Sequence, residues 1–138
     1  MEVVRELLSY GASVDSVNSN GWTPLNTETK EGHFEVVREQ LKHGASVDNA
    51  NKNGSTPLKT AAFGGHVDIF RELLEHGASM DSINNNGSTP LYTAANGGHV
   101  GVVQELLNHG ASVDSVNDDS WAALNTAADE GHVEVVRE

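Results

Sequence analysis

Seven histidines carry the widest range of chemistry in this chain, because imidazole binds metal ions and transfers protons near neutral pH. They form two series whose members are 33 residues apart: His33, His66, His99 and His132, and His43, His76 and His109. A Zn²⁺ ion needs ligands at about 2 Å, whereas members of one series would be roughly 10 Å apart in stacked helical units. We therefore predict no metal site, and we place the second series near helix C-termini, where a positive charge is favoured.

Four aspartates recur with the same interval, and paired carboxylates could act as a general acid and base. They are Asp15, Asp48, Asp81 and Asp114. No nucleophile or base accompanies them locally, so we predict that they form hydrogen bonds in loops. The pairs Gly64-Gly65 and Gly97-Gly98 lack the Gly-x-x-x-x-Gly-Lys-Ser/Thr pattern of a phosphate-binding loop. We thus predict no catalytic residue and no cofactor, and we do not expect an enzyme.

The shared interval marks an internal repeat that runs through the chain. Gly-Ala-Ser-Val or Gly-Ala-Ser-Met begins at Gly11, Gly44, Gly77 and Gly110. Residues 44–76 and 77–109 are identical at 22 of 33 positions. We therefore divide one domain, residues 1–138, into a partial repeat with a second helix only (1–10), unit 1 (11–43), unit 2 (44–76), unit 3 (77–109) and an incomplete unit 4 (110–138).

Unit 3 shows the elements that each repeat should contain. Thr89 and Pro90 are typical of a helix N-terminus, and Gly97-Gly98 should end this first helix. A second helix is predicted from about His99 to Asn108, and residues 111–120 alternate in polarity as in a hairpin-like loop. The apolar residues of the second helix have helical spacing: Val100, Val103, Leu106 and Leu107. Two such short helices cannot bury these side chains alone, so neighbouring units must stack.

The motifs together resemble the ankyrin repeat: Gly-x-Thr-Pro-Leu, then Ala-Ala, then Gly-His, then a Val/Leu-rich helix ending in His-Gly-Ala. The resemblance covers essentially the whole chain. It implies an all-α repeat solenoid of ankyrin-type stacked helix-turn-helix units with β-hairpin loops. It also implies a non-catalytic module that binds a protein partner on a concave face made by the hairpin tips and first helices. Some ankyrin proteins are hydroxylated by an oxygenase at an Asn in the repeated Asp position, so modification of these aspartates stays open.

Several positions depart from the ankyrin pattern. The His that usually follows Thr-Pro-Leu is replaced, which puts the hydrogen-bond lattice of that His in question; the residues here are Asn26, Lys59, Tyr92 and Asn125. Unit 1 has Glu28-Thr29 in place of Ala-Ala and Gln40 in place of Leu, while unit 4 has Ser120 and Ala122-Ala123 in place of Gly and Thr-Pro. We therefore predict that units 2 and 3 form the stable centre of the array.

The two ends lie within repeats. Residues 1–10 have the pattern of a second helix, residues 132–138 begin another, and neither end has the polar capping repeat that such arrays usually need. We therefore expect a fragment of a longer array, and its uncovered ends could self-associate end to end.

Binding residues should lie at hairpin tips and first-helix rims, where the repeat leaves positions free. The candidates are Trp22, Lys30, Glu31, Lys52, Ser55, Phe63, Ser88, Asn96, Trp121 and Asp129. Trp22, Trp121 and Phe63 are the proposed anchors, because aromatic residues are enriched at interface hot spots. The alternative is that each Trp only packs against its neighbouring hairpin.

The net charge is −12, from 20 acidic and 8 basic residues. This charge repels nucleic acid and anionic membrane and favours a basic protein partner. The alternative interpretation is that the acidity only keeps the chain soluble. The absence of Cys, of a long apolar run and of a charged leader leads us to expect a cytoplasmic or nuclear protein. Two alternatives to a binding module stay open: a structural spacer within a longer ankyrin solenoid, and an engineered or reconstructed ankyrin scaffold.

Overall fold

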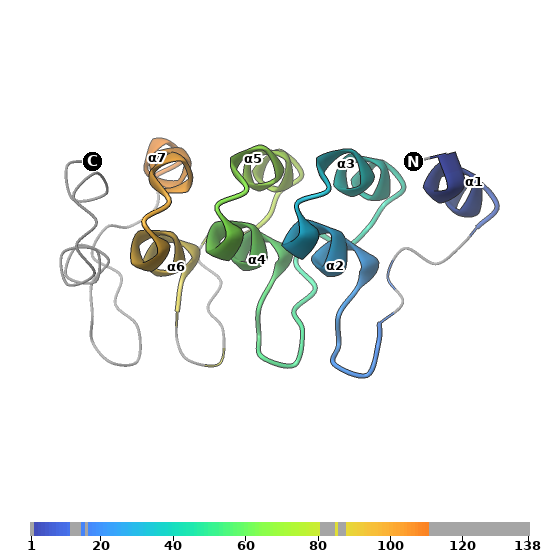
Figure 1. Ribbon diagram of the computed structural model, residues 1–138, viewed down its shortest axis with the longest axis horizontal. Coiled ribbons are helices and arrows are strands. Elements are labelled where there is room, and N and C mark those ends of the chain that lie inside the picture. Colours follow the sequence, from blue (N-terminus) through green and yellow to red (C-terminus); the bar gives the residue numbers. More distant parts are fainter. Residues whose placement is uncertain (1, 12–14, 16, 81–84, 86–87, 111–138) are drawn as a thin grey trace.

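The computed structural model describes residues 2–11, 15, 17–80, 85 and 88–110. The α-helices of this part lie in two layers (Figure 1). One layer holds the first helices of the units: α2 (Pro24–Glu31), α4 (Pro57–Gly64) and α6 (Pro90–Gly97). The other holds the second helices: α1 (Glu2–Ser9), α3 (Phe34–Lys42), α5 (Val67–Glu75) and α7 (Val100–Asn108). The predicted all-α repeat solenoid is confirmed, including the second helix near the N-terminus.

Each first helix begins at the predicted Thr cap, with Pro at the next position. The side-chain oxygen of the Thr accepts a hydrogen bond of 3.1–3.3 Å from the backbone N–H three residues later, in Thr23, Thr56 and Thr89. Each first helix ends at a glycine with left-handed backbone (φ of 70–77°), at Gly32, Gly65 and Gly98. The polar cap and the terminal glycine therefore set the helix boundaries that the Thr-Pro and Gly-Gly patterns predicted.

The turn between α4 and α5 is closed by a histidine of the next unit. The His99 ring contacts the carbonyl oxygen of Phe63 through Nε2, at 2.9 Å, so this nitrogen carries the proton. A Cβ atom at Gly65 would lie only 2.5 Å from Nδ1 of the same ring. Glycine suits position 65 for two reasons: it adopts a left-handed backbone without strain, and its lack of a side chain leaves room for the His99 ring.

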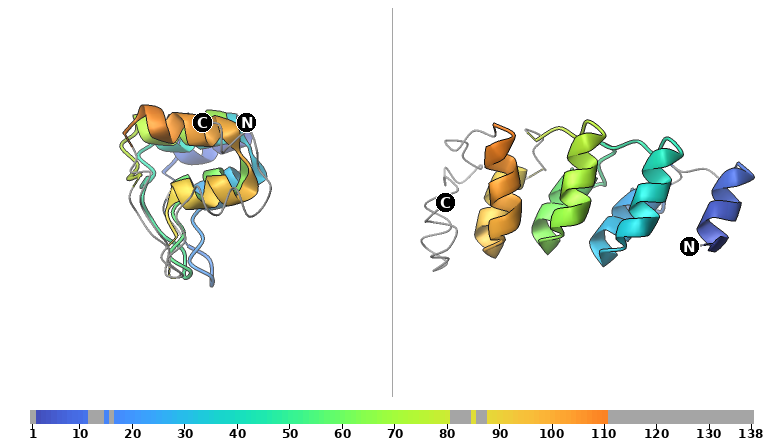
Figure 2. Two further views of the ribbon diagram at one scale, coloured as in Figure 1. Left: turned by 90° about the vertical axis from the view of Figure 1, so that its left-hand side faces the viewer. Right: turned by 90° about the horizontal axis from the view of Figure 1, so that it is seen from above.

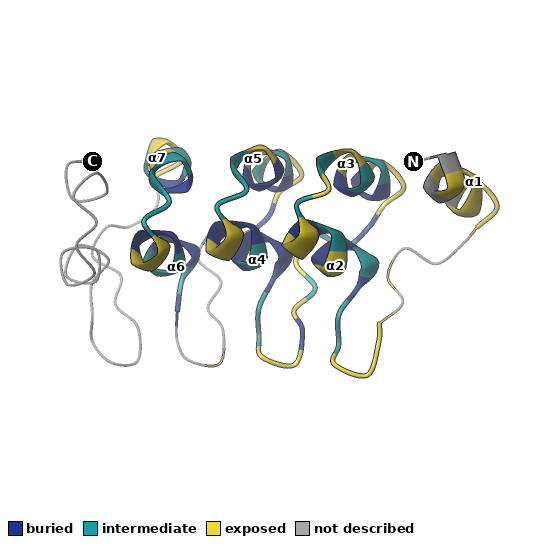
Figure 3. Cartoon of the chain, viewed as in Figure 1, coloured by how far each residue is buried: buried dark blue, intermediate teal, exposed yellow. Residues whose placement is uncertain are grey.

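An apolar core runs between the two layers and continues from unit to unit (Figure 3). The first helices contribute small and branched side chains that are fully or almost fully buried, including Leu58, Ala61, Ala62, Ala94 and Ala95. The second helices contribute larger ones, including Ile69, Phe70, Leu73, Val102 and Leu106. The small alanines allow neighbouring first helices to approach closely.

The loops project from the layer of first helices, away from the second helices (Figure 2). Backbone hydrogen bonds close hairpin-shaped turns, from Asn18 N–H to Trp22 and from Asn51 N–H to Ser55, at 3.1 and 3.0 Å. No strand is assigned among the described residues, so the expected β-hairpins are present as hairpin loops. Lys52 N–H donates to the Asn20 carbonyl at 3.2 Å, so neighbouring loop tips are joined.

Unit 1 buries polar atoms that have no partner. The atoms are Asn26 Oδ1, Thr29 Oγ1 and Gln40 Oε1. Two of these residues occupy positions that hold apolar side chains in units 2 and 3: Thr29 corresponds to Ala62 and Ala95, and Gln40 to Leu73 and Leu106. An unsatisfied buried polar group lowers the free energy of unfolding. The described residues of units 2 and 3 hold no such group, so we expect unit 1 to be the less stable.

The predictions for unit 4 lie outside the described residues. They comprise the loop at 111–120, the departures at Ser120, Ala122-Ala123 and Asn125, and the helix that was to begin at 132. Within the described residues, no helix combines the length and apolar character needed to cross a membrane.

Candidate functional site

A hollow of about 240 Å³ lies where the loops of units 1 and 2 meet the first helices. Its lining comes from three units and combines aromatic, amide, hydroxyl and lysine side chains: Trp22, Lys30, Asn51, Asn53, Ser55, Lys59, Thr60, Phe63 and Thr93. We call this feature the central hollow. The stacking of α2, α4 and α6 side by side (Figure 1) brings these residues together from positions that are far apart in the chain.

Trp22 forms one wall of the central hollow. It is half-buried, and its backbone N–H donates to Asn18 Oδ1 at 3.0 Å, which fixes the residue at the end of the hairpin turn. The Lys30 ammonium lies 5.5 Å from the centre of the Trp22 ring, within range of a cation–π interaction. Trp22 also lines a second hollow with Val17, Asn18 and Thr27, so the indole stands between two depressions of the surface.

Phe63, near the C-terminal end of α4, is the other aromatic residue of the lining. Its side chain is 78% exposed, an unusual state for a large apolar residue. The other large apolar residues that are exposed in the described part lie on α1 or in the loop that follows it: Val3, Leu7, Tyr10 and Val17. Phe63 is thus the exposed aromatic side chain that α4 presents to the central hollow.

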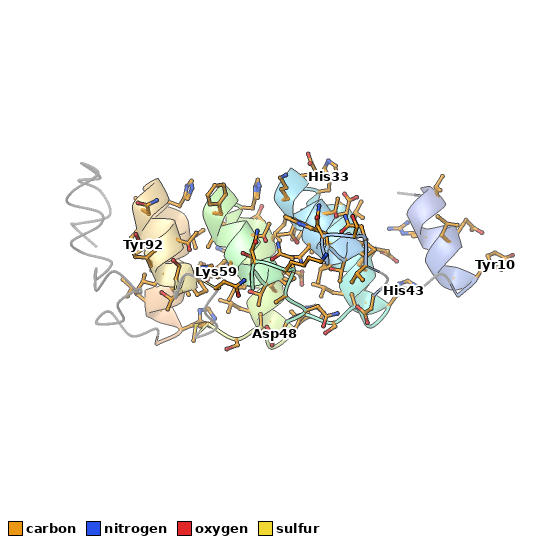
Figure 4. The ribbon with its side chains drawn as sticks, turned by 90° about the horizontal axis from the view of Figure 1, so that it is seen from below. Tyr10, His33, His43, Asp48, Lys59 and Tyr92 are labelled. Atoms are coloured by element: carbon orange, nitrogen blue, oxygen red, sulfur yellow. The ribbon has the colours of Figure 1, made fainter. Side chains whose placement is uncertain are left out.

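Lys59 is buried at the inner side of the central hollow. Only 3% of the residue is exposed, and its ammonium donates to the carbonyl oxygen of Ser88 at 2.5 Å. Figure 4 shows Lys59 on α4 in the middle of the array, with Tyr92 on the neighbouring first helix. Burial lowers the pKa of Lys59 from 10.5 to about 8, because the charged form loses hydration.

The structure brings four of the predicted binding residues together, since Trp22, Lys30, Ser55 and Phe63 all line the central hollow. Glu31, Lys52 and Asn96 are exposed but do not belong to its lining. Trp121 and Asp129 lie outside the described residues.

Ser88 corrects the expectation that all the candidates are exposed. The residue is only 9% exposed, and its carbonyl accepts the hydrogen bond from Lys59. The predicted exposure of Ser88 is therefore wrong, because Ser88 lies against the buried Lys59 side chain of the preceding unit.

Sequence reasoning missed Lys59 as a member of the site, together with Asn51, Thr60 and Thr93. The sequence did contain a sign that Lys59 is special, because it replaces the usual His after Thr-Pro-Leu. A lysine that points inward needs a partner for its charge. The other three stand at positions that do not vary between units, since Asn51 recurs as Asn18 and Asn84, and Thr60 and Thr93 are the same position in successive units. The search for binding residues at variable positions therefore passed over them.

The repeated aspartates have the structural role that their loop positions predicted. Asp15 Oδ1 accepts from the backbone N–H of Ser46 at 2.9 Å, and Asp48 Oδ1 accepts from that of Ser79 at 3.1 Å. Each bond joins one unit to the next. Asp81 and Asp114 lie outside the described residues.

The second series of histidines lies at helix C-termini, as predicted. His43, His76 and His109 follow the last residues of α3, α5 and α7, and the Nδ1 of each contacts the carbonyl four residues earlier at 2.7–3.0 Å. In the first series, His33 contacts the Glu28 carboxylate. No group of three or more potential metal ligands occurs in the described ranges.

The arginines of the described residues lie on the second helices, away from the central hollow. Along the second helices, each Arg pairs with a Glu of the following second helix, in Arg5–Glu39, Arg38–Glu72 and Arg71–Glu105, at 3.4, 3.4 and 2.7 Å. The hydrogen bond with Glu105 raises the pKa of Arg71. The lining of the central hollow contains Lys30 and Lys59 but no Asp or Glu.

Comparison with known proteins agrees with this architecture. The family model described as ankyrin repeats (3 copies) matches residues 1–84 and 76–138. No curated protein matches the chain. The Thr-Pro caps, the glycine-terminated first helices, the paired layers and the family match lead to one conclusion: the chain belongs to the ankyrin-repeat family.

Proposed function

We propose that this ankyrin array binds a segment of a partner protein at the central hollow and along the adjoining loop tips. Ankyrin repeats are generally protein–protein interaction modules, and the choice of this surface is our inference. The observation that carries it is that Trp22 and Phe63 line the same depression. Aromatic residues next to a concave surface are typical anchors of a binding site.

The same observation favours a binding module over a structural spacer. A spacer needs only a polar cover outside its stacking contacts, and such a role gives no reason for two aromatic residues to line one depression. Phe63 is instead exposed beside Trp22 and polar groups that can form hydrogen bonds. The combination of apolar walls and polar lining is what a site for a peptide segment requires.

The net charge supports a partner with basic residues outside the central hollow. A charge of −12 attracts a cationic surface and accelerates its association, especially at low salt. We therefore expect the association rate with the partner to fall as ionic strength rises.

Selection from a library of random dodecapeptides displayed on phage tests the proposed surface. The selected peptides should bind the double variant Trp22→Ala/Phe63→Ala at least tenfold more weakly than the wild-type chain. The matched control is Glu35→Ala, an exposed residue of α3 in the other layer, and it should leave affinity unchanged. Equal binding of the peptides to the wild-type protein and the double variant would show that another surface, or none, is used.

We also propose that two copies associate through α1. Val3 and Leu7 are exposed on α1, although the corresponding residues of unit 2, Ile69 and Leu73, are buried. Within units 1 to 3 a first helix packs beside each second helix and covers these equivalent positions. The apolar stripe of one copy can cover that of another, as in a two-fold symmetric contact.

Sedimentation velocity over a wide concentration range tests this association. The wild-type chain should show a reversible dimer, and Val3→Ser/Leu7→Ser should abolish it. A wild-type protein that stays monomeric at every concentration would refute the α1 contact without affecting the proposed peptide site.

A further inference from the structure

The central hollow differs in charge from the rest of the molecule, and this difference defines what it can bind. We propose that it takes one carboxylate side chain, an Asp or Glu of the bound segment, with a bulky apolar neighbour of that side chain packed on Phe63. The proposal rests on the proposed function, because it specifies the partner chemistry at the same surface. It concerns a single acidic residue within an otherwise neutral or basic segment.

The charge balance of the lining is the first observation. The whole chain has 20 acidic and 8 basic residues, yet the nine residues around the central hollow include two lysines and no Asp or Glu. The three arginines in the described ranges are already paired with glutamates on the second helices. The lysines of the lining are therefore cations without a carboxylate partner in that lining, at a place where a negative group would be attracted.

The surroundings of Lys59 are the second observation. Its ammonium has three N–H donors, and in the described part of the chain its one hydrogen-bond acceptor is the neutral carbonyl of Ser88. Burial lowers its pKa to about 8, which means that the folded protein holds this charge at a free-energy cost. A carboxylate beside the ammonium would offset that cost through a charge-assisted hydrogen bond.

Lys30 and the two aromatic walls complete the site. Lys30 lies at the Trp22 ring and lines the same hollow as Lys59, so positive charges border it from both α2 and α4. The volume of about 240 Å³ is well above the roughly 30 Å³ of one water molecule. The exposed Phe63 ring then offers apolar surface to the residue next to the carboxylate.

The surrounding acidity selects against polyanions. A nucleic acid or a strongly acidic peptide would be repelled by the net charge of −12 before it reached the central hollow. A segment with one carboxylate and basic flanking residues fits both charge distributions. The acidic protein attracts its flanking residues, and the two lysines of the central hollow attract its carboxylate. This arrangement also fixes the register of the bound segment.

Peptides selected by the wild-type chain from the random dodecapeptide library provide the test. We expect a recurring Asp or Glu next to a bulky apolar residue. Replacement of that Asp or Glu by Asn or Gln should weaken binding to the wild-type chain at least tenfold, but change binding to Lys59→Met less than twofold. Lys42→Met, which alters an exposed lysine of α3, is the control and should behave as the wild-type chain does.

Lys30→Met is the second variant, since Lys30 is exposed and its replacement leaves the core intact. As with Lys59→Met, replacing the peptide Asp or Glu by Asn or Gln should weaken binding to Lys30→Met less than it weakens binding to the wild-type chain. Selected peptides that depend on Trp22 and Phe63 but tolerate loss of the carboxylate would overturn this inference and leave the proposed function standing. Selected peptides that are indifferent to Trp22 and Phe63 would overturn both. A phosphoserine that binds more than tenfold tighter than the carboxylate would reassign the site to phosphate.

Discussion

The ammonium of Lys59 donates a 2.5 Å hydrogen bond to the carbonyl oxygen of Ser88, and this bond joins the first helix of unit 2 to the loop of unit 3. Asn26 holds the same position in unit 1, and its amide donates to the carbonyl of Asn49 in the next loop at 3.3 Å. The position after Thr-Pro-Leu therefore still connects neighbouring units, although neither residue is the usual His. The difference is that Lys59 places a charge where Asn26 places a neutral amide.

Raising the pH should stabilise the wild-type chain relative to Lys59→Met. The pKa of Lys59 is about 8 in the folded protein and 10.5 in an exposed lysine, because burial disfavours the charged form. Between these values the unfolded chain binds more protons than the folded one, so the free energy of unfolding rises with pH. Below about pH 8 both states carry the proton, and the effect of burial is constant.

The central hollow is open to solvent, and screening limits this gain to about 1–2 kcal/mol. Chemical denaturation of both proteins at pH 7 and at pH 10 measures it. A stability difference between wild type and Lys59→Met that is the same at both pH values contradicts the prediction.

The affinity for the selected peptides that carry one Asp or Glu should show the opposite dependence on pH. The carboxylate needs the protonated Lys59, so affinity should fall several-fold between pH 7 and pH 9.5, where the ammonium loses its proton. Titration calorimetry at a series of pH values checks this, and Lys59→Met is the control whose affinity should change little.

Replacing the polar core residues of unit 1 should stabilise the protein. Thr29→Ala and Gln40→Leu each remove a buried polar atom without a partner and introduce the side chain that units 2 and 3 already use. We expect a gain of about 1 kcal/mol for each variant. The reverse change, Ala62→Thr, should destabilise unit 2 by about 1–3 kcal/mol. Thermal or urea denaturation measures all three, and an unstable Gln40→Leu would contradict the interpretation.

Replacing two glycines that have a left-handed backbone should show how much stability is lost to backbone strain and how much to a steric clash. Gly65 has φ of 70°, and an added Cβ would lie 2.5 Å from His99 Nδ1. Gly77 has φ of 88° and has no atom within 4 Å of an added Cβ. Gly77→Ala should therefore cost about 1 kcal/mol for the backbone alone, and Gly65→Ala about 2–3 kcal/mol because the ring must also move. Equal losses would show that the His99 contact is unimportant.

Amide hydrogen exchange should be slowest in α4 and α5 and faster in α1 and α2. The helices of unit 2 are flanked by stacked units on both sides, and Phe70 and Leu73 are fully buried. α1 is mostly exposed (Figure 3), and unit 1 holds the three unpartnered polar atoms. Local opening takes less free energy where fewer apolar contacts are broken. Slowest exchange in α1 or α2 would refute the predicted stable centre.

The helices could be read from the sequence because their limits are set by local chemistry. Thr89-Pro90 and Gly97-Gly98 specify where a helix begins and ends whatever surrounds them, and α6 follows them closely. The repeat interval then supplied the stacking order. These features depend on residue type and spacing alone, so the fold was predictable.

The site was only partly predictable because it depends on distances between units. Trp22 and Phe63 were identified from their residue types, yet nothing in the sequence said that they line one hollow. Ser88 was expected among the exposed candidates, yet it is only 9% exposed and its carbonyl accepts the hydrogen bond from Lys59 of the preceding unit. Lys59 was recognised as a departure from the family pattern, but its role depends on residues contributed by three units.

The ladder of Arg–Glu pairs has a consequence for how such a chain can change in length. Each pair spans 34 residues, from Arg5 to Glu39, from Arg38 to Glu72 and from Arg71 to Glu105. Gain of a whole 33-residue copy at an interface would therefore restore the same pair on each side of the insertion. The central hollow has no such freedom, because units 1, 2 and 3 each supply part of its lining and their residues differ. Duplication could lengthen this array without disturbing the stacking of its helices, but an insertion among these three units would separate the residues that together line the central hollow.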